Sequence, residues 1–292
     1  MPGQREKISD DDANRARDGL TFLLTSISGL FQLLDELPTA SSQAEAERGT
    51  FTEPDLITHA ITCGCLSIAS VMDHSSAFFR SSQSPATLFA PWTCARAVLE
   101  SATIAMWLLD PRIDARVRVG RHLSFRYEGF VQQKKYDLPT LAPDLAASIE
   151  NRIEALEAKA DHLGFTQLRK NEKRTGVAQH YPTMTDLCQT MLGAKLQYKL
   201  LCAIAHSQPW ALQQVGFHIR EQTTGDRPRL LPLVEPKPAT LAWTCQIVAQ
   251  WSTQAIWFQW RYLGGNLQRL ERAFEDGFDA MRLDQQSRFW RR

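Results

Sequence analysis

The sequence has almost no net charge and no compositional bias. Its 33 Lys and Arg residues against 32 Asp and Glu residues leave a formal charge of +1, which excludes a polyanion-coating protein and an acidic disordered tail. A charged fraction of 22% and 8 Trp exclude an intrinsically disordered chain. Gly and Pro show no period, so collagen-like and solenoid architectures are also excluded. With 292 residues, 43% of them hydrophobic, the chain can bury a full core as one large domain or two.

Cysteine is sparse, and the 6 cysteines lie inside apolar helical patterns rather than in loops. A secreted disulfide framework would be denser and would follow a signal peptide. Residues 1–7 are polar and contain no apolar stretch of the secretory type. We therefore expect a protein of the reducing cytoplasm.

Long apolar runs are also scarce, and one segment is long enough and free enough of charge to be considered as a membrane span. Residues 241–260 form a run of 20 residues without a charge, about the span of a bilayer core. Polar side chains interrupt this run, among them Gln246, Gln250 and Gln259. Each amide would need a partner in hydrocarbon, where an unsatisfied polar group is costly. We expect a core helix of a bundle and no membrane span.

Apolar residues recur at helical spacing along most of the chain, so the sequence predicts an all-α protein. We expect a bundle of about eight or nine helices, with at most one short β-hairpin near residues 217–234. Residues 39–50 and 165–182 are polar and lack periodicity, which predicts surface loops. The expected helices cover residues 20–34, 84–109, 112–137, 143–163, 184–192, 194–208, 239–263 and 266–286. The second expected helix begins at the Thr52 cap, has an apolar stripe from Ile57 to Met72 and contains His74 in its last third.

Capping residues fix several of the expected helix starts. Thr52 and Thr183, each followed three residues later by Asp, predict N-terminal capping boxes. Asp110 before Pro111 predicts the N-cap of the helix at 112–137. Pro91 either kinks the helix at 84–109 or moves its start downstream.

These elements predict four parts of the chain. We expect a polar N-terminal segment at 1–18, a main helical bundle at 19–215, a loop or short hairpin at 216–238, and C-terminal helices at 239–292 that pack back on the bundle.

Common catalytic and cofactor motifs do not occur. The sequence has no glycine-rich phosphate loop, no Gly-x-Ser-x-Gly turn, no His-Glu-x-x-His and no di-iron pattern. His59 and Cys63 share a helix face, but no second ligand pair follows at zinc spacing. We expect neither a metal nor a cofactor.

Arg96 and Glu100 lie one turn apart in an otherwise apolar helix, on the row that also holds Thr103 and Trp107. A charged pair that faces a core must be paired and hydrogen-bonded. Two interpretations stay open: a structural ion pair that fixes the register of the helix, or a polar site inside the bundle.

Two histidines could join that interior. His74 follows Asp73 in the last third of the second helix, where the pair could lie at the rim of the site or be an ordinary satisfied histidine. His206 ends an apolar helix and shares a face with Lys199 and Cys202. Its imidazole could be enclosed by neighbouring helices, or it could cap the last carbonyls of its own helix.

The helix near residues 112–135 is locally basic, which is typical of a surface that meets phosphate or carboxylate groups. The alternative is a solvated helix face whose charges have partners elsewhere. Its basic residues are Arg112, Arg116, Arg118, Arg121, Arg126, Lys134 and Lys135.

Together these residues resemble a pattern found in uncharacterised, largely actinobacterial helical proteins. The pattern spans residues ~60–215, and in this sequence its parts are Asp73-His74, residues 96–100, residues 107–111, Arg118, Arg121, Tyr198 and His206. The last helix resembles, more loosely, the HEPN superfamily of helical bundles, many of which are dimeric. Several of those cleave RNA with an Arg and a His four to six residues apart, a spacing that Arg116 and His122 meet and that is absent near His206.

Three functions compete on these observations. The first is a HEPN-like, homo-oligomeric RNA-binding or RNA-cleaving effector, with His122 or His206 as acid and base and with Arg116 or Arg118 stabilising charge on phosphate. The second is a bundle that binds an anionic small molecule. The third is a partner-binding protein that uses the Trp-rich segment at 243–260 and the tail at 288–292. The second function would use Asp73, His74, Arg96, Glu100, Trp107, Arg121, Tyr198 and His206.

Overall fold

The computed structural model describes residues 10–31, 37–83, 87, 89–135, 143–212, 217–220 and 233–281, and it confirms the all-α class. Within these residues there are eleven helices and two separate two-stranded hairpins, compared with the eight or nine helices expected. The helices are α1 (Asp10–Phe31), α2 (Gln43–Thr50), α3 (Pro54–Ser82), α4 (Ala90–Leu108), α5 (Ala115–Lys135), α7 (Pro143–His162), α8 (Met184–Leu192), α9 (Lys195–Ala205), α10 (Pro209–Ala211), α11 (Pro238–Leu263) and α12 (Leu267–Ala280).

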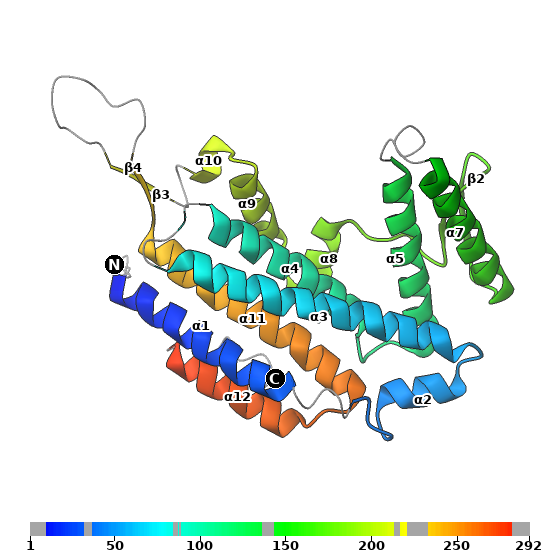
Figure 1. Ribbon diagram of the computed structural model, residues 1–292, viewed down its shortest axis with the longest axis horizontal. Coiled ribbons are helices and arrows are strands. Elements are labelled where there is room, and N and C mark those ends of the chain that lie inside the picture. Colours follow the sequence, from blue (N-terminus) through cyan, green and yellow to red (C-terminus); the bar gives the residue numbers. More distant parts are fainter. Residues whose placement is uncertain are drawn as a thin grey trace, which may run out of the picture.

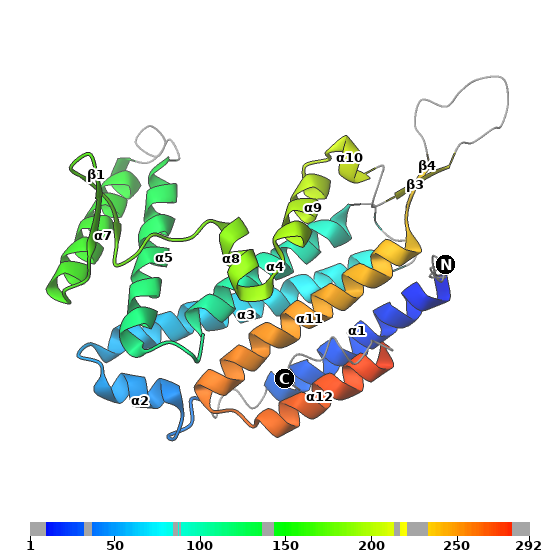
Figure 2. The same ribbon diagram turned by 180° about the vertical axis from the view of Figure 1, so that it is seen from behind.

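Five long helices form the main bundle (Figure 1). Helices α3, α4 and α11 pack against one another along their lengths, and α1 contacts both α11 and α12. The short helices α8 and α9 pack on α4 on the side away from α1 and α12, and α10 contacts α9 (Figure 2). The charge-free run at 241–260 thus lies in α11, in the middle of the bundle and in contact with α1, α3 and α4.

The main core follows from the apolar faces of these five helices. Leu20, Leu23 and Ile27 of α1 are fully buried, as the helical spacing of the sequence predicts. Helix α11 is buried on several faces, and both Trp251 and Trp260 belong to this core. Burial of such large apolar side chains is the main favourable contribution to the stability of the bundle.

A second, smaller core lies at one end of the bundle, where α5 and α7 project from it together with a hairpin of β1 (Gln167–Lys170) and β2 (Lys173–Val177) (Figure 1). Leu56 and Ile57 of α3 extend into this cluster. The other buried members are Val119, Leu123, Tyr127, Ala160 and Val177. A third, small cluster consists of Trp107, Leu108 and Leu187. The described part of the region predicted as one bundle at 19–215 therefore contains three hydrophobic clusters, and the two larger ones share α3.

Both segments that were predicted as surface loops contain secondary structure. Residues 43–50 form α2, whose N-cap Ser42 accepts a hydrogen bond from the Glu45 amide at 3.2 Å. Ser42 and Glu45 have the Ser-x-x-Glu spacing of a capping box, but only the Ser42 cap is formed, because the Ser42 amide donates to the Thr39 carbonyl. The loop expected at 165–182 contains the β1–β2 hairpin, which turns at Asn171 and Glu172, both at positive φ. Two positive-φ residues are the requirement of the common two-residue hairpin turn.

The predicted helix starts were partly wrong. The capping box at Thr183 is confirmed, and Pro91 does move the start of its helix downstream, to Ala90. Helix α3 begins at Pro54 without a side-chain cap, so Thr52 does not have the predicted role. Asp110 does not cap α5 either, because that helix begins at Ala115 and the Val117 amide donates to Asp114 at 2.8 Å.

The predicted hairpin near 217–234 is present as β3 (Phe217–Arg220) and β4 (Leu233–Pro236), which pair antiparallel from Phe217 opposite Pro236 to Arg220 opposite Leu233. Helix α1 begins at Asp10, within the segment predicted as polar and N-terminal. Residues 1–9 and 282–292 lie outside the described residues.

Among the described residues, one helix is long and apolar enough to cross a membrane, and it is α3 rather than the charge-free α11. Length and composition alone do not distinguish a membrane span from a core helix or a signal sequence, which meet the same criterion. In this structure α3 contacts α1, α2, α4, α5 and α11.

Candidate functional site

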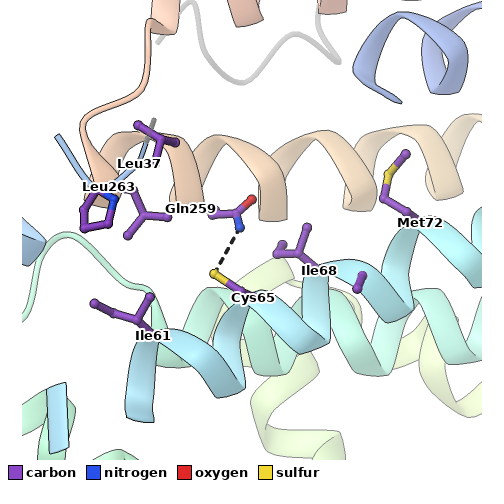
Figure 3. Close-up of a pocket in the computed structure, with 9 residues that line it drawn as sticks. Leu37, Ile61, Cys65, Ile68, Met72, Gln259 and Leu263 are labelled. Atoms are coloured by element: carbon purple, nitrogen blue, oxygen red, sulfur yellow. Dashed lines mark hydrogen bonds between the residues drawn. The ribbon is translucent and has the colours of Figure 1, made fainter. Parts of the chain in front are cut away.

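A cavity of about 510 Å³ lies between α3 and α11, and the residues before α2 close one side of it (Figure 3). Its volume falls within the range of about 300–1,000 Å³ that is usual for small-molecule sites. We call it the α3–α11 cavity. Its walls consist of Leu37, Pro38, Ile61, Cys65, Ile68, Ala69, Met72, Gln259 and Leu263.

The spacing of the lining residues explains why one cavity collects them. Ile61, Cys65, Ile68 and Met72 follow one another by three or four positions along α3 and so lie on one face of that helix. Gln259 and Leu263 are one turn apart on α11, which packs against the same face. The cavity is therefore the part of the α3–α11 interface where side chains do not fill the space between the two helices.

The end of α11 anchors the third wall. The Thr39 amide donates to the Leu263 carbonyl at 3.0 Å, which holds the segment of Leu37 and Pro38 against the helix. Gly264 caps α11 at φ +81°, and a β-carbon there would come within 2.2 Å of the Thr39 hydroxyl. Only glycine allows both this left-handed conformation and this close approach.

Among the described lining residues, Gln259 is the one with a side-chain amide, and the oxygen of that amide has no hydrogen-bond partner. The residue is 1% exposed. Its Nε2 donates to Sγ of Cys65 at 3.2 Å, whereas its buried Oε1 has no hydrogen-bond partner. Figure 3 shows the nitrogen facing Cys65 and the oxygen turned away from it. Burial raises the pKa of the Cys65 thiol, so the sulfur stays protonated at neutral pH.

The anion site that the sequence predicts concerns other residues. Among the described residues, no ionisable side chain other than the Cys65 thiol lines this cavity. A charged group buried against these walls would lose its hydration without gaining a counter-charge from them, which is unfavourable. Sequence reasoning singled out Gln259 only as a polar residue that argues against membrane insertion, although an amide on an apolar helix was the available signal.

Arg118, a predicted catalytic residue, is a structural residue. It is 0% exposed, and its guanidinium makes two hydrogen bonds to the Glu47 carboxylate, at 2.8 and 3.2 Å. It also donates to the carbonyls of Leu108 and Asp110, at 2.6 and 2.9 Å, and stacks on the Tyr262 ring. With its donors used in this way, Arg118 fixes α2, α5 and α11 to one another and is not accessible to a substrate.

Arg121 and Trp107, predicted ligand-binding residues, do meet, at the C-terminal end of α4. Arg121 donates to the Trp107 carbonyl at 2.7 Å and lies over the indole ring. Its second partner is Asp110, at 3.6 Å. Despite the opposing effect of its burial, the hydrogen bonds from Arg112 and the nearby positive charges hold the pKa of Asp110 below its ordinary value. This group stabilises the turn between α4 and α5.

Arg116 and His122 have the spacing of the HEPN pattern but lie in different surroundings. Arg116 is exposed, donates to the carbonyls of Leu163 and Gly164, and stacks on Phe165, so it caps the end of α7. His122 is 2% exposed and its Nδ1 has no partner. Burial, together with the positive charge of Arg126, lowers its pKa to about 4, so it is neutral at physiological pH.

The Arg96–Glu100 pair lies at the edge of the bundle, where α4 meets α9. Arg96 Nε donates to Glu100 at 2.8 Å, with the two side chains 25% and 30% exposed. Arg96 also lies over the ring of Tyr198, 5.8 Å from its centroid. Burial raises the pKa of the Tyr198 hydroxyl, which also hydrogen-bonds with Cys202. Three of the predicted residues therefore converge, as a half-exposed helix contact rather than a buried polar site.

The remaining predicted residues do not join them. Asp73 is exposed and His74 is half-buried on α3, and His206 is exposed at the C-cap of α9. Within the described part of the chain, no hydrogen bond or ion pair links any of these residues to Arg96 or Glu100.

The basic helix and the Trp-rich helix are engaged largely in internal contacts. Besides the arginines above, Arg112 pairs with Asp110 and Lys134 pairs with Glu150. Trp251 and Trp260 are buried in the core.

Comparison with protein-family models, with curated proteins and with solved structures finds no significant match to this chain.

Proposed function

We propose that this chain binds a small neutral molecule in the α3–α11 cavity. The observation that carries the proposal is an apolar cavity of about 510 Å³ between two packed helices. Ligand pockets are typically apolar with a few placed polar groups that orient the ligand. The alternative of a small-molecule-binding bundle thus has support, at a different place from the polar residues first considered.

RNA cleavage of the HEPN type has less support from the same residues. Arg118 is fully engaged with Glu47, and Arg116 caps α7 rather than facing His122. His206 is the one accessible candidate histidine. An RNA-directed activity stays a prediction, and incubation of labelled RNA with the wild type and with His206→Ala tests it.

A neutral fluorescent probe tests the proposed function directly. N-phenyl-naphthylamine is apolar and uncharged, and its emission rises when it leaves water for an apolar site. We expect saturable binding of one molecule per chain to the wild type. Ala69→Phe places an aromatic ring at the cavity wall, at a residue exposed enough to tolerate it, and should weaken binding about tenfold or more through loss of volume.

The matched control is Leu66→Phe, on the same helix at a residue that is 65% exposed and does not line the cavity. It should bind the probe as the wild type does. Binding that does not saturate, or that Ala69→Phe and Leu66→Phe affect equally, would overturn the proposal.

A further inference from the structure

Two sulfur-containing side chains lie on the same wall of the α3–α11 cavity. Cys65 and Met72 are half-buried residues of α3, seven positions apart, and both line the cavity. Seven residues of an α-helix make about two turns and span about 10.5 Å. Figure 3 shows both side chains on the side of α3 that faces α11. The wall thus has a sulfur-containing side chain at each end of a two-turn stretch of α3.

The residue between them on this wall is Ala69. It lies four positions after Cys65 and three before Met72, so the three side chains share one face of α3. Its methyl group leaves the space between the two longer side chains unfilled. Because Ala69 is exposed and also lines the cavity, a ligand can reach this space.

The spacing of the two sulfur-containing residues suits an aromatic ring. Sulfur atoms make favourable contacts with aromatic rings at about 5 Å. A ring over Ala69 is about one helical turn, roughly 5 Å along α3, from each of Cys65 and Met72. None of the described lining residues is aromatic, so the ring has to come from the ligand.

Resting on the proposed function, we infer that the ligand is a neutral molecule with an aromatic ring, which lies over Ala69 between the sulfur atoms of Cys65 and Met72. The other lining side chains are mostly aliphatic and contact the remainder of the molecule. A purely aliphatic ligand would bury its surface in the same cavity but would not gain the two sulfur–ring contacts.

Two matched probes test the inference. 3-Phenylpropanol and 3-cyclohexylpropanol have the same chain and the same hydroxyl group and differ only in the ring. The cyclohexyl compound is the more hydrophobic of the two, so a preference for the phenyl compound cannot come from apolar burial. We expect 3-phenylpropanol to displace N-phenyl-naphthylamine from the wild type at a concentration about twofold to tenfold lower than 3-cyclohexylpropanol, as the sulfur–ring contacts predict.

Variants at the two sulfur-containing residues test the origin of this preference. Met72→Leu keeps the volume of the side chain and removes its sulfur. Cys65→Ala removes the other sulfur, and the loss of side-chain volume affects both probes alike. Each variant should reduce the preference for the phenyl compound about twofold or more, and the double variant should abolish it.

Met106→Leu is the matched control, because Met106 is a buried methionine of α4 in the same core and does not line the cavity. It should keep the preference of the wild type. Thermal unfolding identifies any variant that fails to fold, and each single variant tests the inference independently of the other.

The outcomes separate the two proposals. Saturable probe binding without a preference for 3-phenylpropanol in the wild type would overturn the ligand class and leave the proposed function standing. A preference that either folded single variant leaves unchanged would overturn the placement of the ring between the two sulfur atoms. Failure of N-phenyl-naphthylamine and of both alcohols to bind would overturn the proposed function itself.

Discussion

The guanidinium of Arg118 and the carboxylate of Glu47 form a two-point ion pair in the protein interior, although 71 positions separate them in the sequence. Glu47 belongs to α2 and Arg118 to α5, and the Tyr262 hydroxyl of α11 donates to the same carboxylate at 2.8 Å. A buried ion pair of this kind is costly to break, because the partner that remains is an unpaired buried charge.

Arg118→Met should therefore destabilise the fold by about 3–5 kcal/mol. Denaturant unfolding measures the effect, and Arg126→Met, at an exposed residue of the same helix, is the control that should change stability by less than about 0.5 kcal/mol. In the double variant Glu47→Gln with Arg118→Met, the buried charge is gone, so part of the stability should return. A double variant no more stable than Arg118→Met would contradict this account.

Tyr262→Phe removes one hydrogen bond to the Glu47 carboxylate and keeps the ring that stacks on Arg118. Hydrogen bonds to charged groups contribute about 1.5–3 kcal/mol, and we expect a loss within that range. Tyr181→Phe is the matched control, because the Tyr181 hydroxyl makes no hydrogen bond to a described residue and its ring packs against Trp107 and Phe125. Equal losses in the free energy of unfolding of the two variants would show that the hydrogen bond to Glu47 adds no measurable stability.

Stability should fall with acid because of His122. Its pKa in the folded protein is about 4, below the ordinary value of 6.5, so between these values the unfolded chain binds a proton that the folded protein does not. The neutral, buried His122 therefore lowers the free energy of unfolding only in acid. The loss begins as the pH falls through 6.5 and reaches about 3 kcal/mol near pH 4.

The measurement is the free energy of unfolding at several pH values for the wild type and for His122→Leu. The variant should show a smaller loss between pH 6.5 and 4, because it lacks the titrating group. His162→Gln, at an exposed histidine in the last turn of α7, should follow the wild type. Parallel curves for the wild type and His122→Leu would contradict the lowered pKa.

Gln259→Leu should make the ligand-free protein more stable by about 1 kcal/mol, because an unsatisfied buried oxygen costs about 1–3 kcal/mol and its contact with a thiol returns little of that. Thermal unfolding measures the gain, with Gln254→Leu, at a half-buried position of α11, as the control. A destabilised Gln259→Leu would show that the amide contributes to the stability of the fold.

The class of the fold and most of its helices could be predicted from the sequence because their signals are local. The helical spacing of Leu20, Leu23 and Ile27 and the capping box at Thr183 each depend on residues within a few turns. Helix α2 was missed because its single-turn signal, Ser42 with Glu45, lies in a polar segment that lacks an apolar stripe. The β1–β2 hairpin was missed because charged residues on an exposed two-stranded ribbon show no alternation of apolar residues.

The candidate site was harder to predict because it depends on distant contacts. Nothing near Arg118 in the sequence indicates that Glu47 neutralises it, so the sequence alone predicts a charge that is available to a substrate. The cavity depends on residues from three separate segments, represented by Leu37, Cys65 and Gln259. Apolar residues that line a cavity have the same helical spacing in the sequence as those that fill a core, so the sequence does not distinguish them.

Because α3 contributes to two hydrophobic clusters, its two ends should unfold locally with different partners. Leu56 and Ile57 belong to the smaller cluster, Ile68 and Val71 to the larger, and Ile61 packs against both. Amide hydrogen exchange proceeds through local unfolding, and contiguous cooperative units exchange together. The amides of α3 should therefore divide near Ile61, with the first turns exchanging at the rate of α5 and the later turns at the slower rate of α11.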